Sequence, residues 1–230
     1  MSESELRGRS AHMAMTIEQL ADTEFWRSFT ALELDVPVTV DFYLHALKQG
    51  LFPWNDIGAP RTWWSPDPRA VLFLNEFHVS RSLSRTIRQQ RFEVTFDHDF
   101  ERTVKGCADR DQTWLDPELV RALQEMHELG ITHSVETWRN GNLVGGVYGI
   151  DVDGIFVGDS MFHYEPNASK VALAFLVDHL RNCGFQILDC QVLNEHTESL
   201  GARNIPRDEF YTLVDETRNS DTMPRWHFSR

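Results

Sequence analysis

The sequence predicts an α+β fold in which a small N-terminal domain precedes a larger domain, an antiparallel sheet with flanking helices. Three strand-like segments, 132–138, 143–150 and 155–162, follow one another closely. Asn140-Gly141 and Asp153-Gly154 join them, and both dipeptides favour tight hairpin turns. A helical segment and one more strand-like segment follow this meander, an order typical of α+β domains.

Apolar periodicity and capping residues predict the remaining elements. Thr39 and Asn167 stand where an N-cap is needed, and Gly50, Gly130 and Gly184 mark C-terminal stops. In chain order these elements are helix 39–50, strand 70–74, helix 81–89, strand 92–96, helix 117–129, helix 168–183 and strand 186–193. The glycines at 145, 146 and 149 lie inside a strand and precede no helix, so we expect close packing or a bulge there rather than a nucleotide loop.

The stretch from 51 to 68 is rich in proline and tryptophan. It holds four of the nine prolines, Pro53, Pro60, Pro66 and Pro68. Proline stiffens the backbone and removes N–H donors, so the stretch is predicted to be extended and ordered. We therefore place a boundary after Asp67, with a small domain over 1–67, weakly structured up to about residue 23, and a catalytic domain over 68–230.

Composition excludes several classes of protein. No apolar stretch approaches the roughly 18–20 residues that span a bilayer, and the first fifteen residues lack the apolar core of a signal peptide. We therefore expect a cytoplasmic protein without membrane association. Since no interface-sized apolar stripe is apparent, a monomer is expected. The formal net charge of −13 disfavours nonspecific nucleic-acid binding outside a local basic patch.

Metal and disulfide sites are not expected. The three cysteines, Cys107, Cys183 and Cys190, form an odd set without C-x-x-C spacing. Two histidine–glutamate pairs, His133 with Glu136 and His196 with Glu198, lack the spacing of known metal motifs.

One basic patch stands against this acidic background. Arg81, Arg85 and Arg88 share one face of the predicted helix, and Arg91 follows closely. Such a face either is solvated and pairs with neighbouring acids or binds phosphate, whose geometry guanidinium matches bidentately.

A second group of polar residues lies inside apolar strands. Asp189 and Gln191 are two residues apart, so regular strand alternation predicts that they share a face. Asp159 is another acid within an apolar strand. These groups are either satisfied buried polar residues or a constellation that orients an amine and polarises a carbonyl, as acyl transfer requires.

Ordered motifs over about residues 40 to 210 resemble the leucyl/phenylalanyl-tRNA–protein transferase family. The matching stretches are Leu51-Phe52-Pro53-Trp54, Trp63-Trp64-Ser65-Pro66-Asp67-Pro68-Arg69, His78-Val79-Ser80-Arg81-Ser82-Leu83, Thr113-Trp114, His133-Ser134-Val135-Glu136, Leu143-Val144-Gly145-Gly146-Val147-Tyr148-Gly149, Asp159-Ser160-Met161-Phe162, Asn167-Ala168-Ser169-Lys170, Asp189-Cys190-Gln191 and Ser199-Leu200-Gly201-Ala202.

The resemblance implies a fold, an activity and a set of site residues. The fold is a small N-terminal domain joined to a domain like the Gcn5-related acetyltransferases. The activity moves leucine or phenylalanine from aminoacyl-tRNA to an N-terminal arginine or lysine of a protein and creates a degradation signal. An apolar pocket discriminates by only about 1–3 kcal/mol per methylene, so tolerance of methionine would follow. By similarity, the catalytic positions are Asp189, Gln191, Asp159 and Asn194. The apolar pocket and adenosine site would be lined by Trp54, Trp114, Val147, Phe156, Met161, Leu176 and Leu188, and the tRNA would be contacted by Arg81, Arg85, Arg88 and Arg91.

The implied chemistry requires no metal or nucleotide cofactor, because an aminoacyl ester is already activated. One departure concerns Asp159, where the family usually has glutamate, and the shorter side chain predicts reduced activity or altered acceptor preference. Two other readings stay open. A coenzyme-A-dependent N-acetyltransferase is disfavoured because segment 165–170 contains no glycine to cradle a pyrophosphate. A non-catalytic module that binds tRNA or N-terminal arginine is the second.

Overall fold

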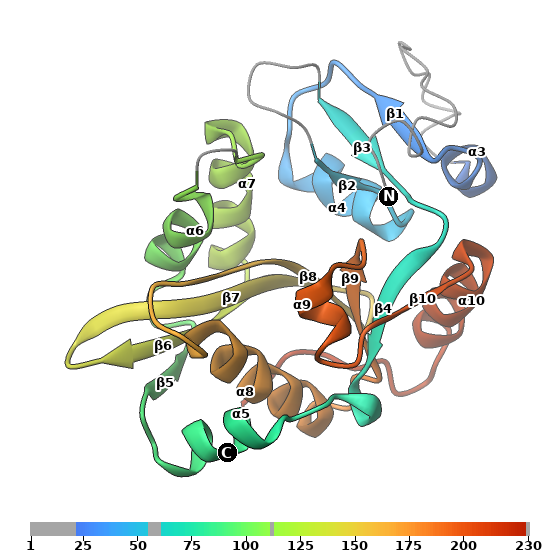
Figure 1. Ribbon diagram of the computed structural model, residues 1–230. Coiled ribbons are helices and arrows are strands. Elements are labelled where there is room, and N and C mark those ends of the chain that lie inside the picture. The colour runs from blue at the N-terminus through green and yellow to red at the C-terminus, as the bar shows by residue number, and fades with distance from the viewer. Residues whose placement is uncertain (1–21, 55–60, 111–112, 229–230) are drawn as a thin grey trace.

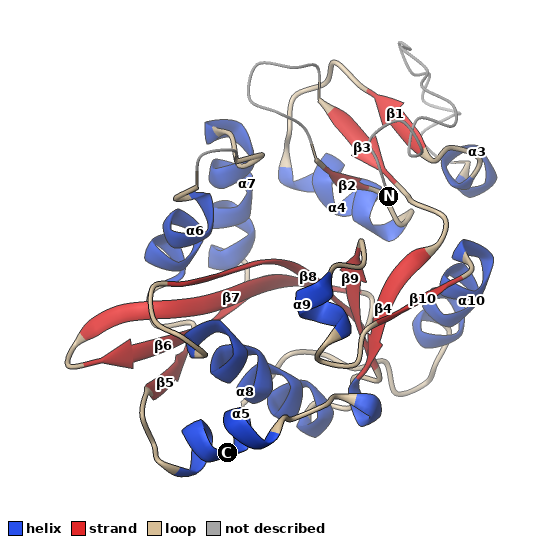
Figure 2. Ribbon diagram, viewed as in Figure 1, coloured by secondary structure: helices blue, strands red, loops and turns tan. Residues whose placement is uncertain are grey.

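The computed structural model describes residues 22–54, 61–110 and 113–228, which form two β-sheets with flanking helices (Figures 1 and 2). The predicted α+β class is confirmed. Nearly all of the opening segment that we expected to be weakly structured lies outside the described residues.

The smaller sheet has three short antiparallel strands in the order β1-β3-β2. These are β1 (Ala31–Glu33), β2 (Phe52–Pro53) and β3 (Thr62–Trp64), and the helices beside them are α3 (Thr23–Arg27) and α4 (Val40–Lys48). The Thr39 side chain accepts the Phe42 N–H and caps α4, as predicted. Strands of two or three residues carry too little alternation to be found by sequence pattern, which is why this sheet was not predicted.

The larger sheet has seven strands in the order β10-β4-β9-β8-β7-β6-β5. Its strands are β4 (Arg69–Phe73), β5 (Glu93–Phe96), β6 (Thr132–Arg139), β7 (Asn142–Val152), β8 (Ile155–His163), β9 (Ile187–Gln191) and β10 (Arg203–Ile205). All neighbouring pairs are antiparallel except β8 and β9, which are parallel. The predicted meander is confirmed as β6-β7-β8. Asn140 and Asp153 have the positive φ angles that its tight hairpins require.

Helices cover both faces of the larger sheet. Their bounds are η1 (Leu74–Glu76), α5 (Arg81–Arg88), α6 (Phe100–Ala108), α7 (Pro117–Glu128), α8 (Ala168–Asn182), α9 (Glu195–Glu198) and α10 (Arg207–Arg218). Helix α8 packs on one face with α5 beside it, whereas α6 and α7 pack on the other (Figure 1). Gly145 lets α8 approach β7, since a Cβ there would lie 2.6 Å from the Ala168 Cβ. The expected close packing is thus confirmed.

One hydrophobic core runs from the smaller sheet into the larger one. Tyr43 and Trp63 from the N-terminal part belong to the same buried cluster as Leu119, Tyr148 and Phe162. A second cluster fills the space between the sheet and α8. The boundary after Asp67 stays a prediction, because the two parts share one core.

Two shifts of strand register near the centre of the larger sheet position the residues of the candidate site. The register of β7 and β8 shifts between Tyr148 and Gly149, which leaves Asp159 without a direct partner residue. The register of β4 and β9 shifts between Ala70 and Val71, which leaves Cys190 without a direct partner residue on β4. Strands β8 and β9 are paired over only two positions and then diverge. A gap therefore opens between them, with a bulge on each side.

Candidate active site

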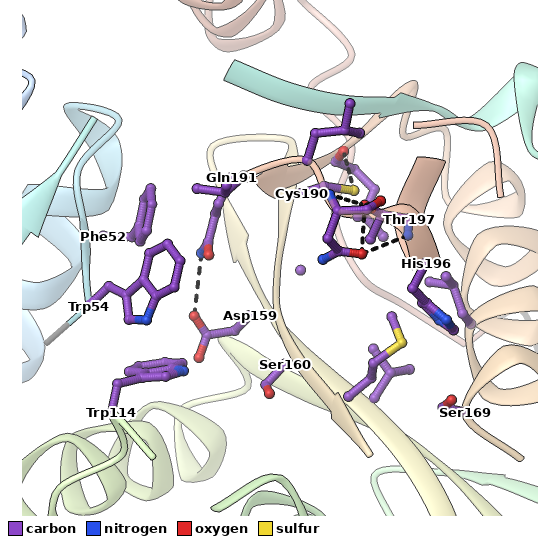
Figure 3. Close-up of a pocket in the computed structure, with 18 of the residues that line it drawn as sticks. Phe52, Trp54, Trp114, Asp159, Ser160, Ser169, Cys190, Gln191, His196 and Thr197 are labelled. Carbon is purple, nitrogen blue, oxygen red and sulfur yellow. Dashed lines mark hydrogen bonds between the residues drawn. The ribbon is translucent and has the colours of Figure 1, made fainter. Parts of the chain in front are cut away.

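A cavity of about 730 Å³ occupies the gap where β8 and β9 diverge (Figure 3). Residues from the smaller sheet, from β7, β8 and β9, and from α8 and α9 line it. Eight of the predicted site residues are in its wall, namely Trp54, Trp114, Val147, Asp159, Met161, Leu188, Gln191 and Asn194. The structure therefore brings together side chains that lie up to 140 positions apart in the chain (54 to 194).

Phe156 and Leu176 are corrections to the predicted pocket. Both are buried in the core between the sheet and α8, with 0% and 1% of their surface exposed, and neither lines the cavity. At Phe156 the strands are still paired, opposite Leu188, so no gap has opened there. Leu176 lies nearly one turn beyond Leu173, which is the α8 residue that reaches the cavity wall.

The main correction concerns the direction of the Asp189 side chain. Regular alternation predicted that its carboxylate and the Gln191 side chain face the same way, but Asp189 is 1% exposed and absent from the cavity wall. Leu188 and Cys190 face the cavity instead. Gln191 joins them because the bulge and its positive φ of 64° break the alternation and turn its side chain inward.

The carboxylate of Asp189 is fully engaged by protein groups. Arg69 donates to it from Nε at 2.9 Å and from Nη2 at 2.6 Å. The backbone N–H of Gln191 donates to its Oδ1 at 2.9 Å. Asp189 is thus a satisfied buried group, and in this arrangement its carboxylate faces Arg69 and the Gln191 backbone rather than the cavity.

Gln191 and Asp159 face each other across the gap. The Gln191 Nε2 donates to the Asp159 Oδ1 at 3.5 Å (Figure 3). The other oxygen, Oδ2, and the Tyr148 hydroxyl are both buried, and neither has a hydrogen-bond partner of good geometry among the described residues, although the hydroxyl is close enough to stabilise the Asp159 carboxylate. A carboxylate with a free oxygen and an amide with a second N–H form a polar pair that can bind both an amine and a carbonyl oxygen.

Burial dominates the electrostatics of this pair. Desolvation raises the pKa of Asp159 to about 6, although the Tyr148 hydroxyl and the Gln191 amide limit the rise. The negative charge of Asp189 adds a smaller upward contribution to the pKa of Asp159. Asp159 is therefore mostly ionised at pH 7 and takes up a proton in mildly acidic solution.

Asn194 lies in the wall beside this pair but has a local structural partner. Its side-chain oxygen accepts the Thr197 N–H at 2.9 Å and caps the short helix α9. This bond fixes the segment that follows Gln191, so Asn194 shapes the cavity at the point where the chain leaves β9.

Aromatic side chains form one end of the cavity. Trp54 is 44% exposed, and Trp114 and Phe52 lie near it (Figure 3). The Trp54 carbonyl accepts a hydrogen bond from the Trp64 indole at 2.6 Å, which holds this end in place. The exposed indole of Trp54 and the half-buried indole of Trp114 are suited to stacking on a planar ring.

The opposite end contains polar residues that sequence reasoning missed. His163, Ser169 and His196 line it, and Ser169 Oγ lies 3.5 Å from His163 Nδ1. Burial, with a smaller contribution from the charge of Lys170, lowers the pKa of His196, whose Nε2 has no described partner. These residues come from three separate segments, so no spacing in the sequence could have grouped them.

The predicted basic patch is exposed on α5. Arg81, Arg85 and Arg88 are exposed and make no ion pair within the described part of the chain, whereas Arg91 lies 3.5 Å from Glu165. The face is therefore solvated, as one of the two readings expected, but its first three arginines do not pair with neighbouring acids among the described residues. Helix α5 packs against α8, whose residues Ser169 and Leu173 line the cavity.

Two further observations bear on what the site can bind. Across the described ranges, no group of three His, Cys, Asp or Glu side chains is placed to hold a metal ion. No helix within those ranges is long and apolar enough to cross a bilayer.

Comparisons with solved structures give similarities of low sequence identity. FemX has a TM-score of 0.47 at 11% identity, with 90% of this chain and 82% of that chain covered. A GCN5-related N-acetyltransferase from Kribbella flavida has a TM-score of 0.40 at 10% identity, with 76% and 64% covered.

Comparisons with protein families and curated proteins give much stronger matches. The family described as leucyl/phenylalanyl-tRNA protein transferase matches residues 71–215, and the N-terminal domain of that transferase matches residues 38–67. A leucyl/phenylalanyl-tRNA–protein transferase of Azotobacter vinelandii is 52% identical over 171 residues, which cover 73% of this chain and 76% of the relative. One from Pseudomonas aeruginosa is 50% identical over 178 residues, covering 76% and 79%. The chain therefore belongs to the leucyl/phenylalanyl-tRNA–protein transferase family, as its motifs predicted, and is an enzyme of that family.

Proposed function

We propose that this enzyme transfers leucine or phenylalanine from aminoacyl-tRNA to an N-terminal arginine or lysine of a protein. The observation that carries the proposal is that two indoles, an apolar wall and the Asp159–Gln191 pair line the same cavity. The product would carry a new N-terminal residue that marks it for degradation. We further propose that the enzyme acts as a cytoplasmic monomer without a cofactor.

The donor end of the tRNA fits the cavity by chemistry. Trp54 and Trp114 supply faces on which the terminal adenine stacks, a contact worth about 1–3 kcal/mol per base. Val147, Met161 and Leu188 supply an apolar wall for the donor side chain. Since one methylene changes binding in such a pocket by only about 1–3 kcal/mol, methionine would also be accepted.

The reaction needs orientation rather than activation. The acceptor nitrogen attacks the ester carbonyl carbon, the bond from that carbon to the ribose oxygen breaks, and a proton passes from the amine to the departing oxygen. Gln191 would donate an N–H to the carbonyl oxygen as negative charge develops on it. The free Asp159 oxygen would hold the amine in line with the carbonyl.

The body of the tRNA would lie on the basic face of α5. Arg81, Arg85 and Arg88 are exposed and unpaired in the described structure, and Arg91 extends the face. Guanidinium groups in this state are available to phosphates. This local patch would overcome the repulsion expected from the net charge of −13.

A transfer assay tests the proposal directly. Purified enzyme is incubated with radiolabelled leucyl-tRNA and a peptide that begins with arginine, and label in the peptide is counted. Transfer to this peptide, but not to the same peptide with an acetylated N-terminus, is the expected result. Binding of leucyl-tRNA without transfer would instead indicate a non-catalytic module. Stabilisation of the protein by acetyl-CoA in a melting assay, with no transfer, would indicate an acetyltransferase.

A further inference from the structure

Arg69, the first residue of β4, is buried and makes hydrogen bonds in two directions. Its Nε and Nη2 donate to the two carboxylate oxygens of Asp189 at 2.9 and 2.6 Å. Its Nη1 donates to the Gly50 carbonyl at 2.9 Å. Arg69 and Asp189 are each 1% exposed, so water contributes little to either side chain.

The guanidinium of Arg69 lies over two aromatic rings. Its central carbon lies 4.9 Å from the centre of the Phe52 ring and 4.7 Å from that of Phe210. Phe52 also lines the cavity and is two residues from Trp54. Arg69 thus contacts the N-terminal sheet, β9 and α10 at once.

A chain of contacts leads from Arg69 to the reacting pair. The Asp189 Oδ1 that accepts the Arg69 Nε also accepts the backbone N–H of Gln191. Gln191 has a φ of 64°, a conformation that a residue other than glycine holds only when its surroundings fix it. Its side chain then reaches Asp159 across the cavity.

We propose that Arg69 is a positioning residue, which, through Asp189, fixes the bulge that aims the Gln191 amide at the reacting ester. This inference rests on the proposed transfer reaction. Asp189 acts through Gln191 and does not touch the substrate. By also binding the Gly50 carbonyl, Arg69 sets the distance between the Gln191 side of the cavity and the Phe52–Trp54 side, where the adenine would stack.

The first test is Arg69→Lys, which keeps the charge but replaces the planar pair of donors with a single ammonium group. We expect kcat to fall about 10²-fold, as displacements near 1 Å can cause. KM for leucyl-tRNA should rise by a much smaller factor, because the indole faces and the basic face are retained and only their distance from Gln191 changes. A fall in kcat/KM that came only from KM would overturn the proposal.

The matched control is Arg27→Lys. Arg27 also forms a bidentate pair with an aspartate, Asp215, at 2.7 Å, and its guanidinium lies over the Tyr211 ring. None of these residues lines the cavity. The control should lower the melting temperature and leave kcat within about twofold of wild type.

A second pair of variants separates positioning from stability. Asp189→Asn alone leaves the buried guanidinium of Arg69 without a counter-charge, whereas Arg69→Gln with Asp189→Asn removes both charges. We expect the double variant to recover the melting temperature lost in the single one but not its kcat. Recovery of both together would show that the pair only stabilises the fold.

The pH profile of Asp189→Asn gives an independent readout. The titratable groups near Asp189 are Arg69 from β4, Asp159 from β8 and Cys190, which follows Asp189 in β9. Asp159, whose pKa is raised to about 6, would give kcat an acid limb. If Asp189 only positions Gln191, this limb persists in the variant, with its midpoint shifted to lower pH because the negative charge of Asp189 is lost. Loss of that limb would identify Asp189 as the proton acceptor and overturn the proposal. Absence of transfer by the wild-type enzyme would instead contradict the proposed function itself.

Discussion

The side chain of Gln191 meets that of Asp159 across the gap between β9 and β8, at 3.5 Å. Each residue lies at a register shift of its strand, and each is turned toward the cavity by that irregularity. Asp159 has no partner residue on β7, whereas Gln191 pairs with Ala70 of β4 directly after the bulge. The polar pair in the cavity therefore exists because two adjacent strands separate after two paired positions.

Removal of the Gln191 amide should slow the chemical step. In Gln191→Ala the developing oxyanion loses its donor, so we expect kcat to fall about 10²–10³-fold with KM for leucyl-tRNA nearly unchanged. Single-turnover transfer rates measure this. Gln90→Ala, at an exposed position outside the cavity, serves as the control. A rate loss below about threefold in Gln191→Ala would exclude the amide from the transition state.

Lengthening Asp159 should speed transfer. The Oδ2 of Asp159 has no partner among the described residues, and one more methylene moves the carboxylate forward by about 1.5 Å. Asp159→Glu is therefore expected to exceed the wild-type rate with an arginine-initiated peptide. A slower Asp159→Glu enzyme would show that the shorter side chain suits this cavity.

The raised pKa of Asp159 predicts a pH-dependent stability. From the ordinary value of 3.8 up to about 6, the folded protein binds more protons than the unfolded chain, so stability falls as pH rises through this window. Above pH 6 the cost of the buried charge is fully present. Asp159→Asn should therefore raise the melting temperature at pH 8 but give no such gain at pH 4. Asp221→Asn, at an exposed site, controls for charge loss, and equal gains at both pH values would contradict this account.

Loss of an indole should weaken donor binding rather than chemistry. Trp114→Ala removes a stacking face in the cavity wall, so KM for leucyl-tRNA should rise about 5- to 150-fold, the equivalent of about 1–3 kcal/mol. Trp114→Phe retains an aromatic face and should recover most of this loss. Competition by a phenylalanyl-adenosine analogue measures the same effect without the rest of the tRNA, and an unchanged inhibition constant in Trp114→Ala would place the adenine elsewhere.

The basic face of α5 should determine the salt dependence of tRNA binding. Arg85→Ala removes one phosphate contact, so affinity should fall and the slope of log K against log salt should become shallower by about 0.7–0.9. Fluorescence anisotropy with labelled tRNA at several salt concentrations measures both. Arg121→Ala, on the exposed side of α7, is the control and should change neither. Identical slopes for Arg85→Ala and wild type would remove α5 from the interface.

Much of the fold could be predicted because its signals are local. The hairpins at Asn140-Gly141 and Asp153-Gly154 need only positive φ angles, and Thr39 needs only the next turn to cap its helix. Asn167 shows the limit of such reasoning. It occupies the N-cap position of α8 in a left-handed conformation, but its side chain donates to Thr86 rather than capping the helix. Helix α6 was missed, although Asp99 caps it at Arg102.

By itself, the sequence determined the order of the meander, the helices that follow it, the arginine face of α5 and the family, since each depends on residues close together in the chain or on ordered motifs. Only the tertiary structure decided which side of β9 meets the cavity. Asp189 and Gln191 would share a face in a regular strand, but the register of β9 against β4, a segment some 120 positions away, inserts a bulge between them. Strand alternation depends on one segment alone, whereas a bulge depends on how two strands pair. The pairing of β9 with β4 therefore had to be known before the direction of either side chain could be predicted.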